Sequence, residues 1–65
     1  MNQFRRARLI QGMTQAEVAS ELGVSIVAVN KWENGRTMPK AKRLKQIAEV
    51  LSTTVEKLLE NERTV

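Results

Sequence analysis

The side chains best suited to contact another molecule lie in the stretch IVAVNK, residues 26–31. Lys31 can donate hydrogen bonds to guanine O6 and N7, and Asn30 can pair with adenine N6 and N7. Ile26 and Val27 offer no hydrogen bonds, but their methyl groups can pack on the methyl group of thymine. These residue types are therefore those that contact base edges in the major groove of DNA.

A helix from Ser25 to about Glu33 is predicted to carry these side chains. Ser25 is a good N-cap, because its hydroxyl can accept a hydrogen bond from a free backbone N–H of the first turn. At about 100° per residue, one side of the helix gathers residues expected in the core, namely Ala28, Val29 and Trp32. The other side gathers residues expected at the surface, namely Val27, Asn30, Lys31 and Asn34.

Two of the apolar residues have a second interpretation. Ile26 lies on the border between the two sides, at the N-terminal tip, and could instead cover the turn before the helix. Val27 could be an exposed apolar residue that contacts nothing. Trp32 is expected in the core, where its ring packs between helices, and is not expected to stack on a base.

The residues before this helix predict a second helix that is joined to it by a short turn. Thr14 and Glu17 have the spacing of a capping box. The residues at core-facing spacing are Gln15, Val18, Ala19 and Leu22. Gly23 is expected to end this helix, because glycine adopts the left-handed conformation without a Cβ penalty. The small Ala19 before the turn and Val29 after it complete the pattern of a helix-turn-helix.

Three further helices are expected. The first covers about Gln3–Gln11, and a fourth begins just after Pro39. The fourth helix has an apolar stripe of Leu44, Ile47, Ala48 and Leu51. A last helix holds Val55, Leu58 and Leu59 and is capped by Thr53 or Thr54, between which the sequence does not decide. No stretch shows sustained strand alternation, so residues 1–65 are predicted to form one compact all-α domain of five helices, with 61–65 as a short frayed tail.

Composition narrows the classes of function. The 65 residues include no cysteine or histidine, and glutamate supplies every acidic side chain, so we expect no metal site and no cofactor. Lone serines and lysines have no activating partner, so we expect no enzyme. No apolar run reaches the length of a membrane span or signal segment, and the expected location is the cytoplasm.

The charge distribution predicts a polyanionic partner. The net charge is +4, and residues 31–45 carry six basic side chains against Glu33 alone. The C-terminal residues 46–65 are acidic by contrast. Any surface that faces DNA is therefore expected in the middle of the chain.

The segment TQAEVASELGVSIVAVNKWENGRTMP resembles the helix-turn-helix of the phage lambda-type repressor and Cro family, also called the xenobiotic-response-element family. The motifs GMTQAEVA, ELGVS, KWENGRTMP and IAEVL are in register, and the resemblance runs from Phe4 to Leu59. It implies a five-helix prokaryotic or phage transcription regulator that binds double-stranded operator DNA. It also implies that Gln15 contacts the DNA backbone and that Arg8 and Glu33 form an ion pair.

Candidate phosphate contacts follow the recognition helix. They are Asn34, Arg36, Lys40 and Lys42, which join Gln15 at the N-terminus of its own helix. The chain departs from the family pattern at three positions. Lys40 stands where the family often has a serine that caps the fourth helix, and Ser52 stands where a glycine usually follows that helix. Ile26 stands where the family often has a polar residue at the start of the third helix.

A homodimer is the expected working form, and it can form in solution or only on DNA. Its contact should avoid the basic middle of the chain, which leaves the C-terminal part, with Val50 and Leu59 as the candidates. An alternative function on the same fold is an antitoxin or antirepressor that acts through a protein partner. The sequence names neither the operator, nor the regulated genes, nor the sign of regulation.

Overall fold

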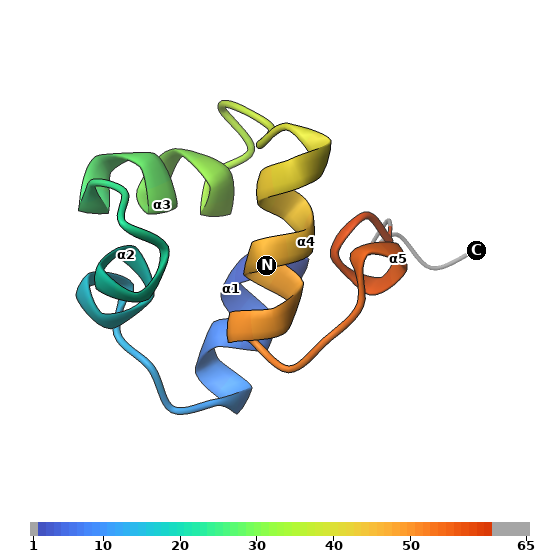
Figure 1. The fold of residues 1–65 in the computed structure, drawn as a ribbon, viewed down its shortest axis with the longest axis horizontal. Helices are drawn as coiled ribbons and strands as arrows, with labels where there is room; N and C mark the ends of the chain where they lie inside the picture. The colour runs from blue at the N-terminus through green and yellow to red at the C-terminus, as the bar shows by residue number, and fades with distance from the viewer. Residues whose placement is uncertain (1, 61–65) are drawn as a thin grey trace.

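The computed structural model describes residues 2–60, and these residues form five α-helices and no strands (Figure 1). The helices are α1 (Gln3–Ile10), α2 (Gln15–Leu22), α3 (Ile26–Glu33), α4 (Ala41–Val50) and α5 (Val55–Leu58). The prediction of a compact five-helix domain is thereby confirmed. The expected tail, 61–65, lies outside the described residues.

Both ends of α2 form as their residues predict. The Thr14 hydroxyl accepts a hydrogen bond from the Glu17 backbone N–H at 3.0 Å, and Glu17 accepts one from the Thr14 N–H at 2.8 Å. At the other end Gly23 has φ 69°, and the Val24 N–H donates to the Ala19 carbonyl. No atom lies within 4 Å of a Cβ built on Gly23, so the positive φ, and not crowding, requires glycine here.

Both departures at the ends of α4 have structural consequences. Lys40 occupies the N-cap position without making a side-chain capping hydrogen bond. Ser52, where the family usually has glycine, has φ 55° and lies in the left-handed region that glycine favours. The N-terminus of α4 therefore lacks the side-chain cap that α2 has, and its C-terminus ends through a residue that adopts positive φ less readily than glycine.

The start of α5 settles the alternative that the sequence left open. The hydroxyl of Thr54 accepts a hydrogen bond from the Lys57 backbone N–H at 3.1 Å, so Thr54 is the cap and not Thr53. Thr53 instead donates its backbone N–H to the carbonyl of Ala48, directly after the left-handed Ser52. Thr53 therefore belongs to the turn that ends α4.

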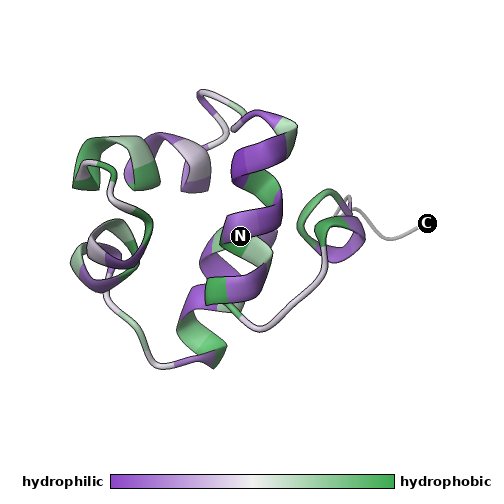
Figure 2. Ribbon diagram, viewed as in Figure 1, coloured by the Kyte–Doolittle hydropathy of each residue, from purple (hydrophilic) through white to green (hydrophobic). Residues whose placement is uncertain are grey.

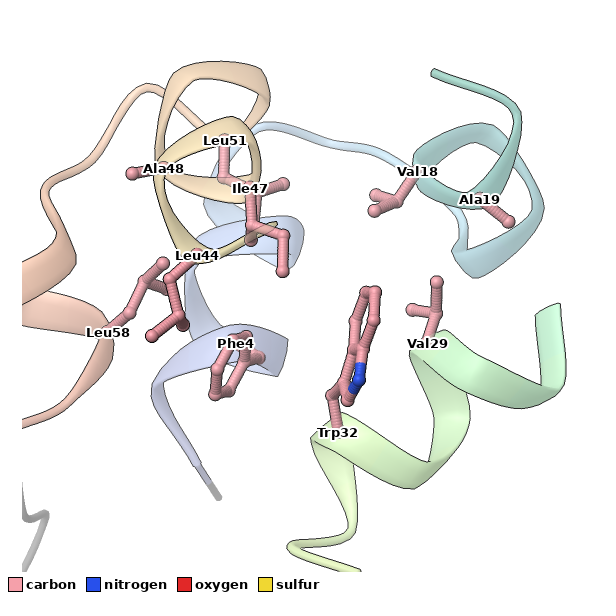
Figure 3. Close-up of a cluster of buried hydrophobic side chains, with 10 residues drawn as sticks. All are labelled: Phe4, Val18, Ala19, Val29, Trp32, Leu44, Ile47, Ala48, Leu51 and Leu58. Carbon is pink, nitrogen blue, oxygen red and sulfur yellow. The ribbon is translucent and has the colours of Figure 1, made fainter. Parts of the chain in front are cut away.

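The hydrophobic core draws on all five helices described (Figure 3). Val29 and Trp32 point inward from α3 and are only 2% and 8% exposed. The full set of buried apolar residues is Phe4, Val18, Ala19, Val29, Trp32, Leu44, Ile47, Ala48, Leu51 and Leu58. The expected core face of α3 is confirmed, and Trp32 belongs to it.

A buried ion pair joins α1 to the end of α3. Arg8 Nε donates to Glu33 Oε2 at 2.6 Å, and Arg8 Nη2 donates to Glu33 Oε1 at 3.1 Å. The two side chains are 11% and 4% exposed. A third bond, from Arg8 Nη1 to the Met13 carbonyl at 2.8 Å, fixes the guanidinium to the turn before α2. The ion pair that the resemblance implied is therefore present, and it also holds the α1–α2 turn.

The Arg8 side of the pair keeps its charge over the working pH range. The hydrogen bond to Glu33 raises the pKa of the Arg8 guanidinium above its ordinary value, although burial acts in the opposite direction. A raised pKa in the folded state stabilises the fold at every pH below the ordinary arginine value. Arginine's part of this stabilisation is therefore lost only in strongly alkaline solution.

Removing one partner of this pair should destabilise the fold. Glu33→Ala leaves the Arg8 charge buried without compensation, which costs about 3–5 kcal/mol in the free energy of unfolding for deeply buried pairs. Glu21→Ala removes the same charge from an exposed position of α2 and should change stability by less than about 0.5 kcal/mol. Thermal or urea melts measure both variants, and equal losses would contradict a stabilising role for the pair.

Candidate nucleic-acid interface

The outward side of α3 carries the four residues predicted to contact bases. Asn30 and Lys31 are exposed, and Ile26 and Val27 are 50% and 61% exposed. Figure 2 shows the N-terminal half of α3 coloured as hydrophobic and a hydrophilic stretch after it. Asn30 and Lys31 follow the apolar residues 26–29 in the sequence. The structure thus places two apolar side chains and two hydrogen-bonding side chains on the exposed part of one short helix.

If Ile26 only covered the turn before α3, much of its side chain would still be exposed to solvent. The Ser25 hydroxyl caps α3 by accepting from the Ala28 N–H at 3.1 Å, which places Ile26 at the first helical position. Val24, within the preceding turn, is the apolar residue there that is partly buried against the core. Half of the Ile26 side chain therefore remains available to a partner.

Asn34 lies next to Asn30, one turn further along. Its Nδ2 donates to Asn30 Oδ1 at 3.0 Å. Residues four apart on a helix are neighbours, so this contact could have been predicted from the sequence spacing, but it was not. The bond orients the Asn30 amide on the exposed side of α3, and Asn34, expected as a phosphate contact, has a second role.

Gln15 is the first residue of α2 and lies close to the buried ion pair. Its Nε2 donates to Glu33 Oε1 at 3.0 Å, and the residue is half-buried. The amide nitrogen carries two N–H groups, so this bond leaves one of them for another acceptor. Sequence reasoning placed Gln15 both on the core-facing stripe and at the DNA backbone, and it missed the hydrogen bond to Glu33.

The basic residues after α3 are exposed and partly share one hollow. Arg36, Lys40 and Lys42 are all exposed. Lys40 and Lys42 line a shallow depression of about 280 Å³ at the N-terminus of α4, together with Arg43 and Gln46. An anion in this depression would meet two lysine side chains and the positive end of a helix.

Arg43 lies in the same depression but is engaged within the fold. Its Nη1 donates to the Leu22 carbonyl at 2.9 Å and to Gln46 Oε1 at 3.0 Å. The first bond satisfies a carbonyl at the C-terminus of α2 and ties that helix to α4. Sequence reasoning counted Arg43 only as part of the basic segment, because this contact depends on how the two helices pack.

The two candidates for the dimer contact differ in exposure. Val50 is half-buried and packs against the core, whereas Leu59 is 52% exposed. Leu59 borders a groove of about 510 Å³ that is also lined by Phe4, Trp32 and Met38. Met38 is 61% exposed and was not predicted as a contact. Leu59 and Met38 therefore offer more free apolar surface than Val50.

Two further observations concern other kinds of site. Within residues 2–60, no three histidine, cysteine or acidic side chains come together in a way that could hold a metal ion. None of the helices in this range is both long enough and apolar enough to cross a membrane.

The candidate interface consists of α3, the N-terminus of α2 and the basic residues 36–42.

A family model described as helix-turn-helix matches residues 4–58. The chain belongs to this helix-turn-helix family. The matched range contains α2 to α5 completely and all of α1 except its first residue, Gln3. The resemblance to lambda-type repressors and Cro is confirmed by this match and by the phage repressor among the relatives below.

Two proteins named as transcription regulators resemble the chain. One is the HTH-type transcriptional activator BcrR of Enterococcus faecalis, which is 34% identical over 62 residues, covering 95% of this chain and 30% of the relative. The other is the cryptic phage CTXphi transcriptional repressor RstR of Vibrio cholerae, 36% identical over 45 residues, covering 69% of this chain and 40% of the relative. The chain thus spans less than half of either relative, and neither name supports the antitoxin or antirepressor alternative.

Proposed function

We propose that this chain is a sequence-specific, double-stranded DNA-binding transcription regulator that inserts α3 into the major groove. The observation that carries the proposal is the division of α3 into two sides. Val29 and Trp32 anchor one side in the core, while Ile26, Val27 and Lys31 remain exposed on the rest. Membership of the helix-turn-helix family and two relatives named as transcription regulators support it.

Base recognition in this proposal divides along α3. Ile26 and Val27 pack on thymine methyl groups, because they are apolar and lie at the N-terminal end that enters the groove. Lys31 donates to guanine O6 and N7, and Asn30 pairs with adenine. The bond from Asn34 leaves the Asn30 Nδ2 group free to donate and one Oδ1 lone pair free to accept, which adenine requires.

Phosphate contacts surround α3 in this proposal. Gln15 reaches the backbone from the N-terminus of α2, where free N–H groups also favour an anion. Arg36, Lys40 and Lys42 supply positive charge from the other end of α3 and from the start of α4. Asn34 lies between these two groups of contacts. Contacts of this kind orient the protein on the duplex but do not select its sequence.

The working form in this proposal is a twofold homodimer that binds an operator in the cytoplasm of a prokaryotic host. One α3 offers a modest contact area, and two α3 helices about 34 Å apart would enter successive major grooves. Leu59, which is 52% exposed at the C-terminal side of the apolar groove, is the preferred contact. Val50, which packs on its own core, contributes at most its exposed edge.

Binding should weaken steeply with salt. Three cationic contacts, Arg36, Lys40 and Lys42, give a slope of log K against log salt of roughly −3 per subunit, at about −0.9 for each neutralised phosphate. Lys42→Gln should make the slope shallower by about 0.9, whereas Lys57→Gln on α5 should leave it unchanged. Fluorescence anisotropy at several salt concentrations measures the slope, and an affinity independent of salt would refute the phosphate contacts.

Base and phosphate contacts should respond differently to mutation. Lys31→Ala should relax discrimination at one base pair per half-site by roughly 1–3 kcal/mol. Lys40→Ala should weaken binding to all sequences alike, because a phosphate contact carries no base information. A binding selection from random duplexes, repeated with both variants, compares them, and sequence-blind losses from both would reject a base contact by Lys31.

The selected site should be an inverted repeat bound with positive cooperativity. Its half-sites should be centred about one helical turn, or ~34 Å, apart. Leu59→Ser should lower affinity for the full repeat by about tenfold or more without changing affinity for a single half-site, because it removes apolar contact between subunits. Leu9→Ser, an exposed apolar position on α1, is the matched control. A half-site bound as tightly as the full repeat would exclude the dimer.

A further inference from the structure

One carboxylate oxygen of Glu33 serves two elements at once. Glu33 Oε1 accepts from Arg8 Nη2 at 3.1 Å and from Gln15 Nε2 at 3.0 Å. The other oxygen accepts from Arg8 Nε at 2.6 Å. Gln15 is the only one of these three residues that the proposed function places on DNA, and it is bound directly to the buried ion pair.

We propose that Glu33 is a positioning residue for DNA binding: with Arg8 as its counter-charge, it holds the Gln15 amide so that its second N–H faces a phosphate. The inference rests on the proposed function, because it requires Gln15 to be a backbone contact. It assigns to the ion pair a role in recognition as well as in stability.

Hydrogen-bond chemistry determines which edge of the amide is held. An ionised carboxylate only accepts hydrogen bonds, so Glu33 binds the nitrogen of Gln15 and not its oxygen. A phosphate also only accepts, and an amide oxygen turned toward it would repel it. By holding Nε2, Glu33 fixes the orientation of the Gln15 amide and therefore the direction of its second N–H. DNA binding then need not restrict the rotation of this side chain, which lowers the entropy cost of binding.

Arg8 is necessary because of charge. A carboxylate without a counter-charge near the phosphate backbone would oppose DNA binding. Two hydrogen bonds from Arg8 neutralise Glu33, and the bond from Arg8 to the Met13 carbonyl keeps the guanidinium in place. The cluster is therefore neutral overall, and it presents a neutral donor, Gln15, at its exposed edge.

The test compares the effect of Gln15→Ala with and without the ion pair. The replacement Arg8→Met with Glu33→Leu removes both charges together, which avoids leaving one of them buried and unpaired. In the wild type, Gln15→Ala should lower operator affinity by about three- to tenfold, the effect of one hydrogen bond. In the replaced protein the same mutation should cost less than about twofold, because Gln15 is no longer held.

A matched control removes two exposed charges instead. Arg5→Met with Glu21→Leu changes the charge in the same way at exposed positions, and Gln15→Ala should retain its full effect there. Equal losses from Gln15→Ala with and without the ion pair would overturn the positioning role. So would a wild type that is insensitive to Gln15→Ala but still binds its operator. A wild type that binds no DNA would instead refute the proposed function.

A second readout separates positioning from a general loss of structure. Methylphosphonate substitution at single positions of the operator should identify one phosphate whose importance disappears in Gln15→Ala. The ion-pair replacement should abolish sensitivity at that same phosphate and leave the others unchanged. A uniform loss at every phosphate would indicate a purely structural role and overturn the proposal.

Nuclear magnetic resonance provides a test that needs no DNA and no replaced ion pair. In the free wild type, one of the two Gln15 Nε2 protons should exchange slowly with solvent, and its chemical shift should lie outside the range of solvent-exposed glutamine side chains. Side-chain amide resonances typical of a freely rotating glutamine would overturn the proposal, whether or not the Arg8→Met, Glu33→Leu protein folds.

Discussion

The arrangement of the elements proposed to bind DNA depends on the buried ion pair between Arg8 and Glu33. It joins α1 to the end of α3 and, through the Met13 carbonyl and the Gln15 amide, reaches the turn before α2 and its first residue. A chain of 65 residues has a small core. Apolar packing is also non-directional, so hydrogen bonds of defined geometry orient the helices in a way that burial alone does not.

The recognition helix performs two tasks with eight residues. Val29 and Trp32 bury its inner side, which leaves the N-terminal tip to carry Ile26 and Val27 into solvent. Both of these apolar side chains are at least half exposed, and the proposed contact with thymine methyl groups would cover them. The family often has a polar residue where Ile26 stands, so this chain is expected to select its own operator sequence.

The relatives show that this helix-turn-helix does not by itself set the sign of regulation. One is named an activator and the other a repressor, although they are 34% and 36% identical to this chain over the matched residues. A shared fold supplies a way to contact DNA, and function depends on what is attached to that contact. The distinctive features of this chain are therefore best sought in its own polar contacts, such as the bond from Gln15 to Glu33.

Capping and periodicity act within a few residues, so the sequence by itself determined the helices, the end of α2 at Gly23 and the two sides of α3. The ion pair was predictable only through the family resemblance. Tertiary structure alone decided that Gln15 bonds to a residue 18 positions away and that Arg43 bonds to one 21 positions away. It also decided that Met38 is exposed beside Leu59. Such contacts depend on how helices pack against one another, and no local pattern of residues encodes that geometry.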